Sequence, residues 1–215
     1  MINSSRPLVF RPIKARSVRI GAGARKGLSL PLPKALKIRP TLGRVKEALF
    51  DILSARIDGC TFLDLYAGTG SIGLEAHSRG ASTVIFVEQN RKTAALLHRN
   101  VARYCTSMPP EQPSTLRIHI LDVEAYLSNT RHRTTPVDII FSDPPYDAPV
   151  SHTFMDRVTR GNWLQPDGLL VVEHRFKHPT DDTCGSFSKT ATYRYGDSAL
   201  SVYEPTSTPS TVSEL

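Results

Sequence analysis

The sequence predicts a doubly wound α/β domain that carries a small basic extension at its N-terminus. Three observations indicate this architecture. Apolar strands alternate with helical segments, a glycine-rich turn follows the first strand of that series, and positive charge is concentrated in the first 50 residues. The chain has 215 residues, of which 40% are hydrophobic and 22% charged, so we expect a single domain with a sizeable core.

The N-terminal segment is expected to fall into three parts. Residues 1–16 are basic and contain proline, and they are predicted to be a disordered tail. Residues 17–40 read as a hairpin over 17–31, with its turn between Gly21 and Gly27, followed by a linker to Pro40. Thr41 is then a plausible N-cap for a helix that runs to about Arg56.

Residues 41–204 are predicted to form the main domain. The expected strands cover 61–65, 83–87, 116–121, 137–141 and 169–173, and the expected helices cover 71–79, 91–104, 123–129 and 150–163. Strands at 187–195 and 199–203, around Gly196, are predicted to close the sheet with an antiparallel hairpin. The Ser/Thr/Pro-rich residues 205–215 are predicted to be a disordered tail.

The charge distribution suggests a segment that binds a polyanion. The chain has 27 Lys and Arg against 20 Asp and Glu, a net charge of +7. Residues 1–50 hold 12 of these cations and one acid, whereas residues 51–215 hold 15 cations and 19 acids. A solvated tail or a targeting extension is an equally plausible interpretation of composition alone. We expect the hairpin to be an arm whose removal leaves the domain folded.

Other features narrow the class of protein. There is no apolar run of roughly 20 residues and no secretory signal, so we expect no membrane span and a cytoplasmic protein. Cys60, Cys105 and Cys184 are isolated, which argues against a disulfide framework and a cysteine-based zinc site. The seven histidines have no metal-ligand spacing, so no metal is expected.

A nucleotide-type pocket is predicted after the strand at 61–65. Gly68, Gly70 and Gly73 satisfy a G-x-G-x-x-G pattern that lets a ligand approach the backbone at the start of a helix. Glu88 follows 20 residues after Gly68, at the end of the next strand, where an acid binds ribose hydroxyls. This pattern alone does not separate a nicotinamide dinucleotide from S-adenosylmethionine (SAM).

Two further acids favour SAM. Asp64 is expected inside the turn, where a carboxylate suits the cationic amino group of a methionine moiety and would repel a pyrophosphate. Asp122 follows the third strand, where its side chain could accept from the adenine amino group. An N-cap role for Asp122 is at least as plausible.

The segment Asp143-Pro144-Pro145-Tyr146 follows the fourth strand and is the candidate catalytic motif. Two consecutive prolines remove two backbone donors, so the preceding carbonyls are left as acceptors. The Asp143 carboxylate is another acceptor, and Tyr146 offers a flat face for stacking. This set suits a planar exocyclic amine, which the acceptors would hold in line with a sulfonium methyl group.

At these motifs the sequence resembles the class I SAM-dependent amino-methyltransferases, which have a Rossmann-like doubly wound sheet. Arg39-Pro40-Thr41, the segment Arg44 to Phe50, the Arg19 to Gly23 hairpin and Tyr195-Gly196-Asp197 narrow the resemblance to the RsmD-like 16S ribosomal RNA guanine-N2 methyltransferases. The resemblance covers about residues 17–204. It implies methylation of guanine 966 of 16S RNA in the assembling small subunit.

The resemblance and the motifs together assign site residues. The cofactor set comprises Asp64, Tyr66, Ala67, Gly68, Thr69, Gly70, Glu88, Gln89, Asp122, Val123 and Asp143. The catalytic set comprises Asp143, Pro144, Pro145 and Tyr146, and the candidate RNA contacts are Arg19, Arg25, Lys26, Arg39, Thr41 and Arg44. We expect a monomer.

Three alternatives stay open at this point. A DNA adenine-N6 methyltransferase would share the Asp-Pro-Pro-Tyr motif, although a chain this short leaves no room for a large DNA-recognition domain. A non-catalytic RNA-binding assembly protein would not need Asp64, Glu88 and Asp143 to be intact. A nicotinamide-dependent oxidoreductase would leave Asp143 to Tyr146 unexplained.

Overall fold

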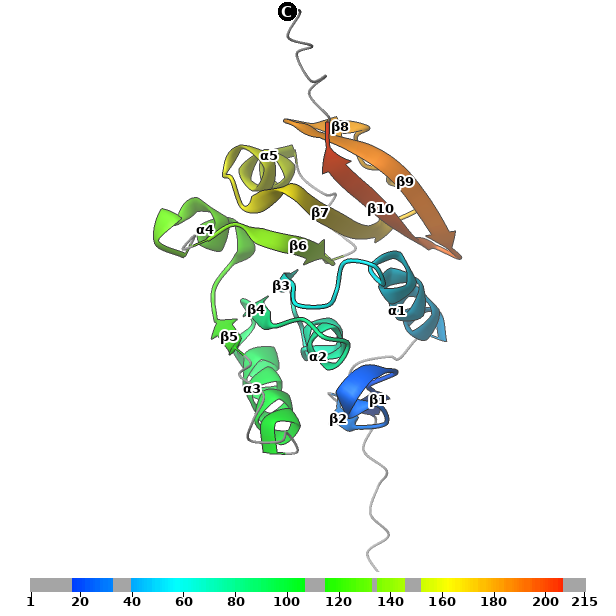
Figure 1. Ribbon diagram of the computed structural model, residues 1–215, viewed down its shortest axis with the longest axis vertical. Coiled ribbons are helices and arrows are strands. Elements are labelled where there is room, and N and C mark those ends of the chain that lie inside the picture. Colours follow the sequence, from blue (N-terminus) through cyan, green and yellow to red (C-terminus); the bar gives the residue numbers. More distant parts are fainter. Residues whose placement is uncertain (1–16, 33–39, 107–114, 133–134, 146–151, 207–215) are drawn as a thin grey trace, which may run out of the picture.

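The computed structural model describes residues 17–32, 40–106, 115–132, 135–145 and 152–206. One eight-stranded sheet, in the order β5-β4-β3-β6-β7-β10-β9-β8, organises these residues, and a separate two-stranded sheet, β1-β2, lies beside it (Figure 1). The strands are β1 (Ser17–Arg19), β2 (Ser29–Pro31), β3 (Thr61–Leu65), β4 (Thr83–Val87), β5 (Thr115–His119), β6 (Val137–Ser142), β7 (Leu164–Arg175), β8 (Thr183–Cys184), β9 (Phe187–Tyr195) and β10 (Ser198–Pro205). The helices are α1 (Pro40–Ile52), α2 (Ser71–Ser78), α3 (Arg91–Thr106), α4 (Val123–Ser128) and α5 (His152–Arg160), with short 3-10 turns at Gly23–Arg25 and Thr130–His132.

Five parallel strands bring the functional segments to one edge of the sheet. Leu65 pairs with Val87 of β4 and with Ser142 of β6, and Ser142 in turn pairs with Val172 of β7. The carboxyl ends of these strands therefore lie level with one another. In open α/β sheets, ligands bind outside this edge.

Helices cover both faces of the sheet, as the apolar strands predicted. Phe62, Val84 and Phe141 pack in one cluster with residues of α1, α2 and α3, and their neighbours Leu63 and Ile140 pack in another with residues of α4 and α5. The central strands β3, β4 and β6 can be apolar on both faces because helices cover both of them. The doubly wound architecture is confirmed.

The C-terminal strands form the antiparallel edge that was predicted. Strand β10 pairs antiparallel with both β7 and β9, and Gly196 makes the β9–β10 turn at φ 64°. Strand β7 is longer than expected, and β8 was not predicted. Strand β10 reaches Pro205, so the sheet includes the first residue of the expected tail, while residues 1–16, 107–114 and 207–215 lie outside the described residues.

Helix α1 begins two residues earlier than an N-cap at Thr41 predicts. It starts at Pro40 and ends at Ile52, so Thr41 lies within the first turn and is not the N-cap. Proline suits this first position because its fixed φ is helical and its missing N–H would have no helical partner. Leu53 lies just beyond the helix yet is fully buried, which explains why the apolar pattern suggested a longer one.

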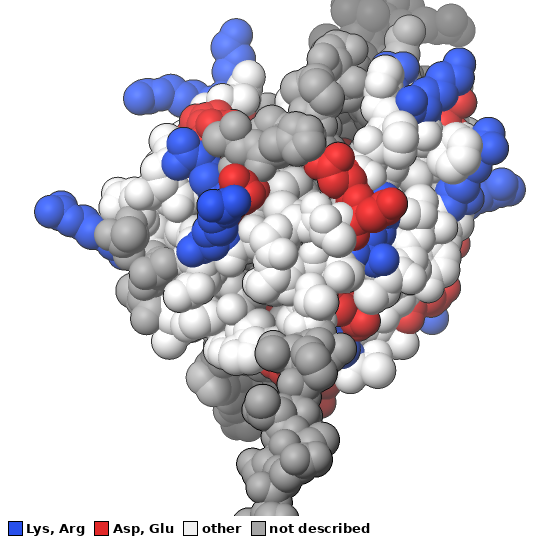
Figure 2. All heavy atoms as spheres, turned by 90° about the horizontal axis from the view of Figure 1, so that it is seen from above, with Lys and Arg blue, Asp and Glu red and all other residues white. Residues whose placement is uncertain are grey.

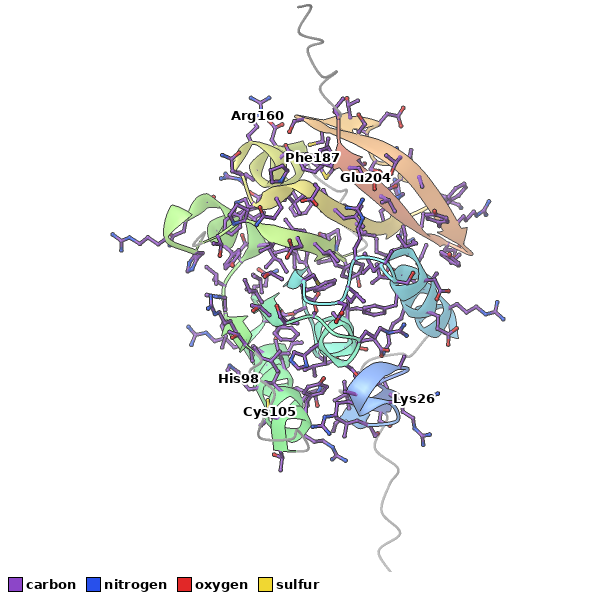
Figure 3. All side chains as sticks on the ribbon, in the orientation of Figure 1. Lys26, His98, Cys105, Arg160, Phe187 and Glu204 are labelled. Carbon is purple, nitrogen blue, oxygen red and sulfur yellow. The ribbon has the colours of Figure 1, made fainter. Side chains whose placement is uncertain are left out.

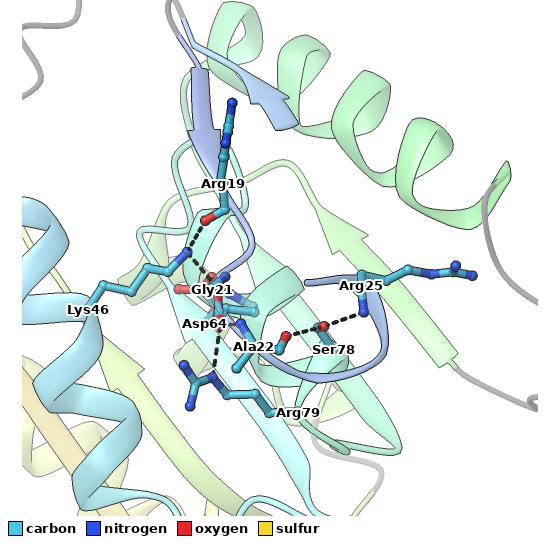
Figure 4. A network of polar contacts seen from close by, with 10 residues as sticks. Arg19, Gly21, Ala22, Arg25, Lys46, Asp64, Ser78 and Arg79 are labelled. Carbon is cyan, nitrogen blue, oxygen red and sulfur yellow. Dashed lines mark hydrogen bonds and ion pairs between the residues drawn. The ribbon is translucent and has the colours of Figure 1, made fainter. Parts of the chain in front are cut away.

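The hairpin formed by β1 and β2 is fixed to the domain by a buried carboxylate, Glu75 of α2. Its two oxygens accept the backbone N–H groups of Gly21 (2.7 Å) and Ala22 (2.9 Å). They also pair with Lys46 Nζ of α1 (2.7 Å) and Arg79 Nε (2.8 Å) (Figure 4). One fully buried side chain thus joins the hairpin, α1 and α2.

Apolar contacts add to this attachment. Ile20 and Leu30 are 1% and 0% exposed, and both belong to the core on the α1–α3 face. Ser78 Oγ accepts from Arg25 N and donates to Ala22 O, which fixes the 3-10 turn of the hairpin against α2. The expectation of a removable arm does not fit these contacts, because deleting residues 1–36 would remove part of the core together with the cations.

The described residues carry other features that bear on the protein's class. None of their helices has the length and apolar character needed to cross a membrane. Cys60 and Cys184 are buried and Cys105 is exposed on α3, and all three are free thiols (Figure 3). The face seen from above carries acidic and basic side chains interspersed, with no large area of one sign (Figure 2).

We predict that Glu75→Gln lowers the free energy of unfolding by about 3 kcal/mol or more. The substitution leaves Lys46, which is 8% exposed, without its anionic partner, and breaking a buried ion pair typically costs that much. Urea denaturation measures the effect. Glu204→Gln is the control, because it breaks an exposed pair with Arg56 and should cost below about 0.5 kcal/mol. Equal losses in the two variants would contradict the role of Glu75.

Candidate functional site

The glycine-rich turn after β3 has an unusual backbone. Tyr66, Gly68 and Gly70 have φ values of 61°, 57° and 82°, and a left-handed conformation is costly for a tyrosine. The Ala67 N–H donates to Val87 O (2.9 Å) and the Gly70 N–H to Ala67 O (2.9 Å), so the loop is anchored to the end of β4. Strain of this kind persists where surrounding contacts fix the loop, and it is common at ligand sites.

Glycine is needed at the three positions of the motif for different physical reasons. A Cβ at Gly70 would lie 2.5 Å from Leu97 Cδ1 of α3, and one at Gly73 would lie 2.3 Å from Phe86 Cε1 of β4, so close packing leaves no room for a side chain at either position. A Cβ at Gly68 would meet only Tyr66 O, at 3.9 Å. Gly68 therefore leaves its side of the turn open to an approaching ligand.

Glu88 is placed against the turn at the end of β4, as the spacing predicted. It is 9% exposed, its Oε2 accepts from Gly68 N (2.9 Å), and its Oε1 accepts from Asn90 N (2.7 Å). A carboxylate has about four acceptor positions, so these two bonds leave capacity for the hydroxyl groups of a ribose. Gln89, the next residue, is exposed.

Asp64 lies in β3 beneath the turn, whereas the sequence suggested a place within the turn. It is 1% exposed, and its Oδ2 accepts the Gly73 N–H (2.9 Å) at the start of α2. Burial raises the pKa of Asp64 to about 7, although the bond from Gly73 opposes the rise and the nearby Glu88 adds to it. A cationic ligand group would restore the ionised form.

Asp122 is the N-cap of α4, the role that was held open for it. Its Oδ1 accepts from Glu124 N (2.9 Å) and Ala125 N (3.2 Å). Burial, followed by the charges of Asp122 and Glu124, raises the pKa of Tyr66 to about 12. Val123 has its side chain in the core, so a ligand contact there would use its main chain.

Asp143 and the prolines follow β6 at the same edge. The Asp143 N–H donates to Leu65 O (3.4 Å), which places the motif beside the end of β3. Asp143 and Pro144 are half-buried and Pro145 is exposed, while Tyr146 lies outside the described residues. Burial raises the pKa of Asp143 well above its usual range, and the charges of Glu173 and Asp64 raise it further.

Glu173 is a residue of this site that the sequence analysis did not single out. It is 4% exposed on β7, directly after the Ser142↔Val172 pair, so it stands next to Asp143 in register. Alternation along the strands places Asp64, Asp143 and Glu173 on the α1–α3 face. The signal was available, because Glu173 follows an apolar run as Glu88 does.

The site therefore presents several carboxylates at one edge of the sheet. Such a lining stabilises a cation and repels a pyrophosphate, so it fits SAM, which carries a sulfonium and an ammonium group, better than a nicotinamide dinucleotide. Within the part of the chain that the structure describes, no group of three or more metal-ligating side chains is arranged to hold an ion.

Asn100 of α3 links the turn to the hairpin and was also missed. Its buried Nδ2 donates to Thr69 O in the turn (2.8 Å) and to Pro31 O at the end of β2 (3.3 Å). A lone asparagine in an amphipathic helix gives no sequence signal for such a link. The hairpin and the cofactor turn are thus held by one side chain.

The candidate RNA contacts that the structure describes come from the hairpin and from α1. Arg19, Lys26 and Arg44 are exposed, and Lys26 lies on the outer side of the hairpin (Figure 3). Arg25 is half-buried, with its guanidinium 6.0 Å from the centre of the Tyr104 ring. Arg39 lies outside the described residues, and Thr41 lies in the first turn of α1.

A family model described as "Conserved hypothetical protein 95" matches residues 18–204. The chain belongs to this family. The ribosomal RNA small subunit methyltransferase D of Haemophilus influenzae is 36% identical over 157 residues, which cover 73% of this chain and 78% of that protein. The predicted resemblance to RsmD-like methyltransferases is confirmed.

Solved structures share the fold. The yhhF structure from Escherichia coli has a TM-score of 0.75 and 26% identity, covering 88% of this chain and 98% of its own. SMU.776, solved in complex with S-adenosylhomocysteine, has a TM-score of 0.62 at 15% identity, covering 82% of this chain and 53% of its own. At that identity, SMU.776 supports the fold alone.

We predict that SAM affinity falls as the pH is lowered from about 7.5 to about 6. Asp64, with its pKa near 7, must be ionised to bind a cationic amino group, so affinity should drop by up to about tenfold per pH unit below that pKa. Titration calorimetry at several pH values measures the effect. Asp64→Asn should bind more weakly and with little pH dependence in this range.

Asp138→Asn is the control for that experiment. Asp138 also belongs to a central strand, but its Oδ2 accepts from Thr61 N (2.7 Å) at the beginning of β3, the opposite edge of the sheet. It should leave the pH profile of the wild type unchanged. A full pH dependence in Asp64→Asn would assign the titrating group elsewhere.

Proposed function

We propose that this protein transfers a methyl group from SAM to the exocyclic N2 of guanine 966 in 16S ribosomal RNA. The observation that carries the proposal is the placement of Asp143 and its two prolines beside the acid-lined turn at one sheet edge. The name of the Haemophilus influenzae relative supports ribosomal RNA as the substrate. The guanine position rests on the RsmD-like resemblance.

The cofactor would be held by residues on both sides of the strand β3. Glu88 suits the ribose, Asp64 suits the methionine amino group, and the open side of Gly68 allows close approach of the ligand to the backbone. SAM would supply an electrophilic methyl group. The carboxylates Asp64 and Asp143 would favour the positive charge of the bound cofactor.

Asp143 would act on the guanine amine. The nitrogen lone pair is delocalised into the ring, so hydrogen bonds from its N–H groups to the Asp143 carboxylate and to the carbonyls before each proline would localise it for attack. As the carbon–nitrogen bond forms and the carbon–sulfur bond breaks, one amine proton becomes acidic. Asp143 would accept that proton, since its raised pKa makes it a stronger acceptor than an exposed aspartate.

The proposed setting is an assembling small subunit, with the protein acting as a monomer. A target inside a folded RNA must leave its stack, which costs a few kcal/mol, and phosphate contacts can supply that free energy. Arg19 and Arg44 are exposed cations on the flank that the hairpin and α1 share. They are the described candidates for this contact.

The deciding experiment is nucleoside mass spectrometry on 16S RNA from cells that lack this protein. Incubation of their small-subunit particles with the purified protein and SAM should raise N2-methylguanosine by up to one residue per RNA, at position 966. Methylation of adenine alone would refute the proposal in favour of an adenine-N6 enzyme. Absence of methylation on both naked RNA and particles would favour a non-catalytic role.

We predict that Asp143→Ala lowers the single-turnover rate by about 100-fold or more, while SAM affinity stays within a few-fold. Loss of one hydrogen bond made in the transition state costs on the order of 3 kcal/mol. Asp156→Ala removes the same charge from a half-exposed position on α5 and should leave the rate unchanged. A near wild-type rate in Asp143→Ala would remove this residue from the chemistry.

A further inference from the structure

We propose that Phe176 and Arg194 form a second RNA-binding surface, on which an unpaired base close to the target guanine stacks. The inference rests on the proposed RNA substrate but adds residues outside the hairpin and α1. Phe176 lies just after β7, and Arg194 lies near the end of β9. Phe176 and Arg194, with the flanking cations Arg175 and Lys177, form a surface that we call the platform.

The platform includes an aromatic ring that is partly exposed at the surface. Phe176 is 40% exposed, and among the described residues only Ile120 and Tyr193 are comparable large apolar side chains at the surface. The Arg194 guanidinium carbon lies 4.0 Å from the centre of the Phe176 ring. A guanidinium stacked on an aromatic ring offers its outer face to a nucleobase and its N–H groups to a phosphate.

The platform carries positive charge, which suits the binding of a polyanion. Arg175, Lys177 and Arg194 are exposed here, and Asp197 is the acid on the adjacent β9–β10 turn. This excess of cations stands out because residues 51–215 as a whole have more acids than bases. A cationic patch with an aromatic ring is typical of surfaces that bind single-stranded nucleic acid.

The platform is held in place before any ligand binds. The Phe176 N–H donates to Asp197 O (2.8 Å), the His178 N–H donates to Arg175 O (2.9 Å), and Arg194 Nε donates to Gly196 O (3.1 Å). The first bond joins the turn after β7 to the tip of the β9–β10 hairpin, and the other two hold the turn and the hairpin tip in shape. A surface that is already ordered loses little conformational entropy on binding.

A buried histidine fixes the turn from below. His174 is 6% exposed, and its Nδ1 lies 2.9 Å from Arg175 O and 3.1 Å from His178 O. Carbonyl oxygens only accept, so Nδ1 carries a hydrogen and holds both ends of the turn. Its Nε2 is bonded to Ser201 Oγ (2.8 Å) in β10, which anchors the turn to the sheet.

The platform lies at the edge of the sheet that carries the catalytic motif. Val172 is level with Ser142, and β7 continues beyond it to Arg175. At about 3.3 Å per residue, Phe176 stands roughly 10 Å farther out than Asp143 along the strand direction. An RNA strand that delivers guanine to Asp143 could therefore reach the platform with a neighbouring nucleotide.

The test measures binding of a 16S RNA fragment that contains the target hairpin, by fluorescence anisotropy. Phe176→Leu removes the ring but keeps an apolar side chain, and it should raise the Kd about tenfold. Phe176→Tyr keeps the ring and should bind within about twofold of the wild type. Arg194→Ala should raise the Kd similarly and make the salt dependence shallower by about 0.7 in log–log slope.

Arg160→Ala is the matched control for the loss of charge. Arg160 ends α5, which leads into the beginning of β7 at the opposite edge of the sheet, and its side chain is 75% exposed (Figure 3). This variant should bind RNA as the wild type does. Melting temperature and SAM affinity should be the same in all variants, which separates lost RNA contact from lost structure.

Unchanged RNA affinity in Phe176→Leu would overturn the inference. If this variant binds the fragment normally but methylates small-subunit particles poorly, the platform contacts a protein of the particle, and the RNA assignment is wrong. The proposed function is tested separately from the platform, and it would be refuted if the wild-type protein produced no N2-methylguanosine. The binding assay does not depend on which base is methylated.

Discussion

The fold depends on the interaction of one buried carboxylate, Glu75, with groups from three elements. Glu75 accepts two backbone N–H groups of the hairpin and pairs with Lys46 of α1 and with Arg79. Burial alone raises the pKa of Glu75, but the bonds from Lys46 and Gly21 outweigh that effect and lower it below the usual range. Because an ionised carboxylate cannot remain buried without these partners, the hairpin and both helices are fixed together.

At the carboxyl edge of the sheet, the pKa values of buried acids shift in the opposite direction. There, Asp64, Asp143 and Glu173 lie close together, and burial raises the pKa of Asp64 and Asp143. The parallel strands place these residues together because their ends are level. Glu75 on α2 is therefore kept ionised by groups of the protein itself, whereas the acids at the sheet edge are suited to pairing with a cationic ligand.

Much of the fold could be predicted because local patterns and long-range packing agreed. Apolar strands, the glycine turn and the acids at strand ends each carry a signal in a few adjacent residues. The start of α1 was missed because Pro40 and Thr41 are both acceptable near a helix start. Contacts between distant residues, such as Glu75 with Gly21 or Asn100 with Thr69, leave no local pattern, so the docking of the hairpin required the structure.

The outline of the site was predictable because its acids also follow short local patterns in the sequence. Glu88 and Asp143 follow apolar strands, and the register of parallel pairing then brings them to one edge. Asp64 was described as part of the turn although the predicted strand at 61–65, which has the bounds of β3, already contained it. The platform at Phe176 was missed because its partner Arg194 is 18 positions away and meets it only through the antiparallel pairing of β7, β10 and β9.

The link that Asn100 makes between Thr69 and Pro31 has a thermodynamic consequence. One amide group bonds both the cofactor turn and the last residue of the hairpin, so ordering either segment reduces the entropy still to be lost by the other. A change in the conformation of the turn at Thr69 would therefore disturb a side chain that also holds the end of β2.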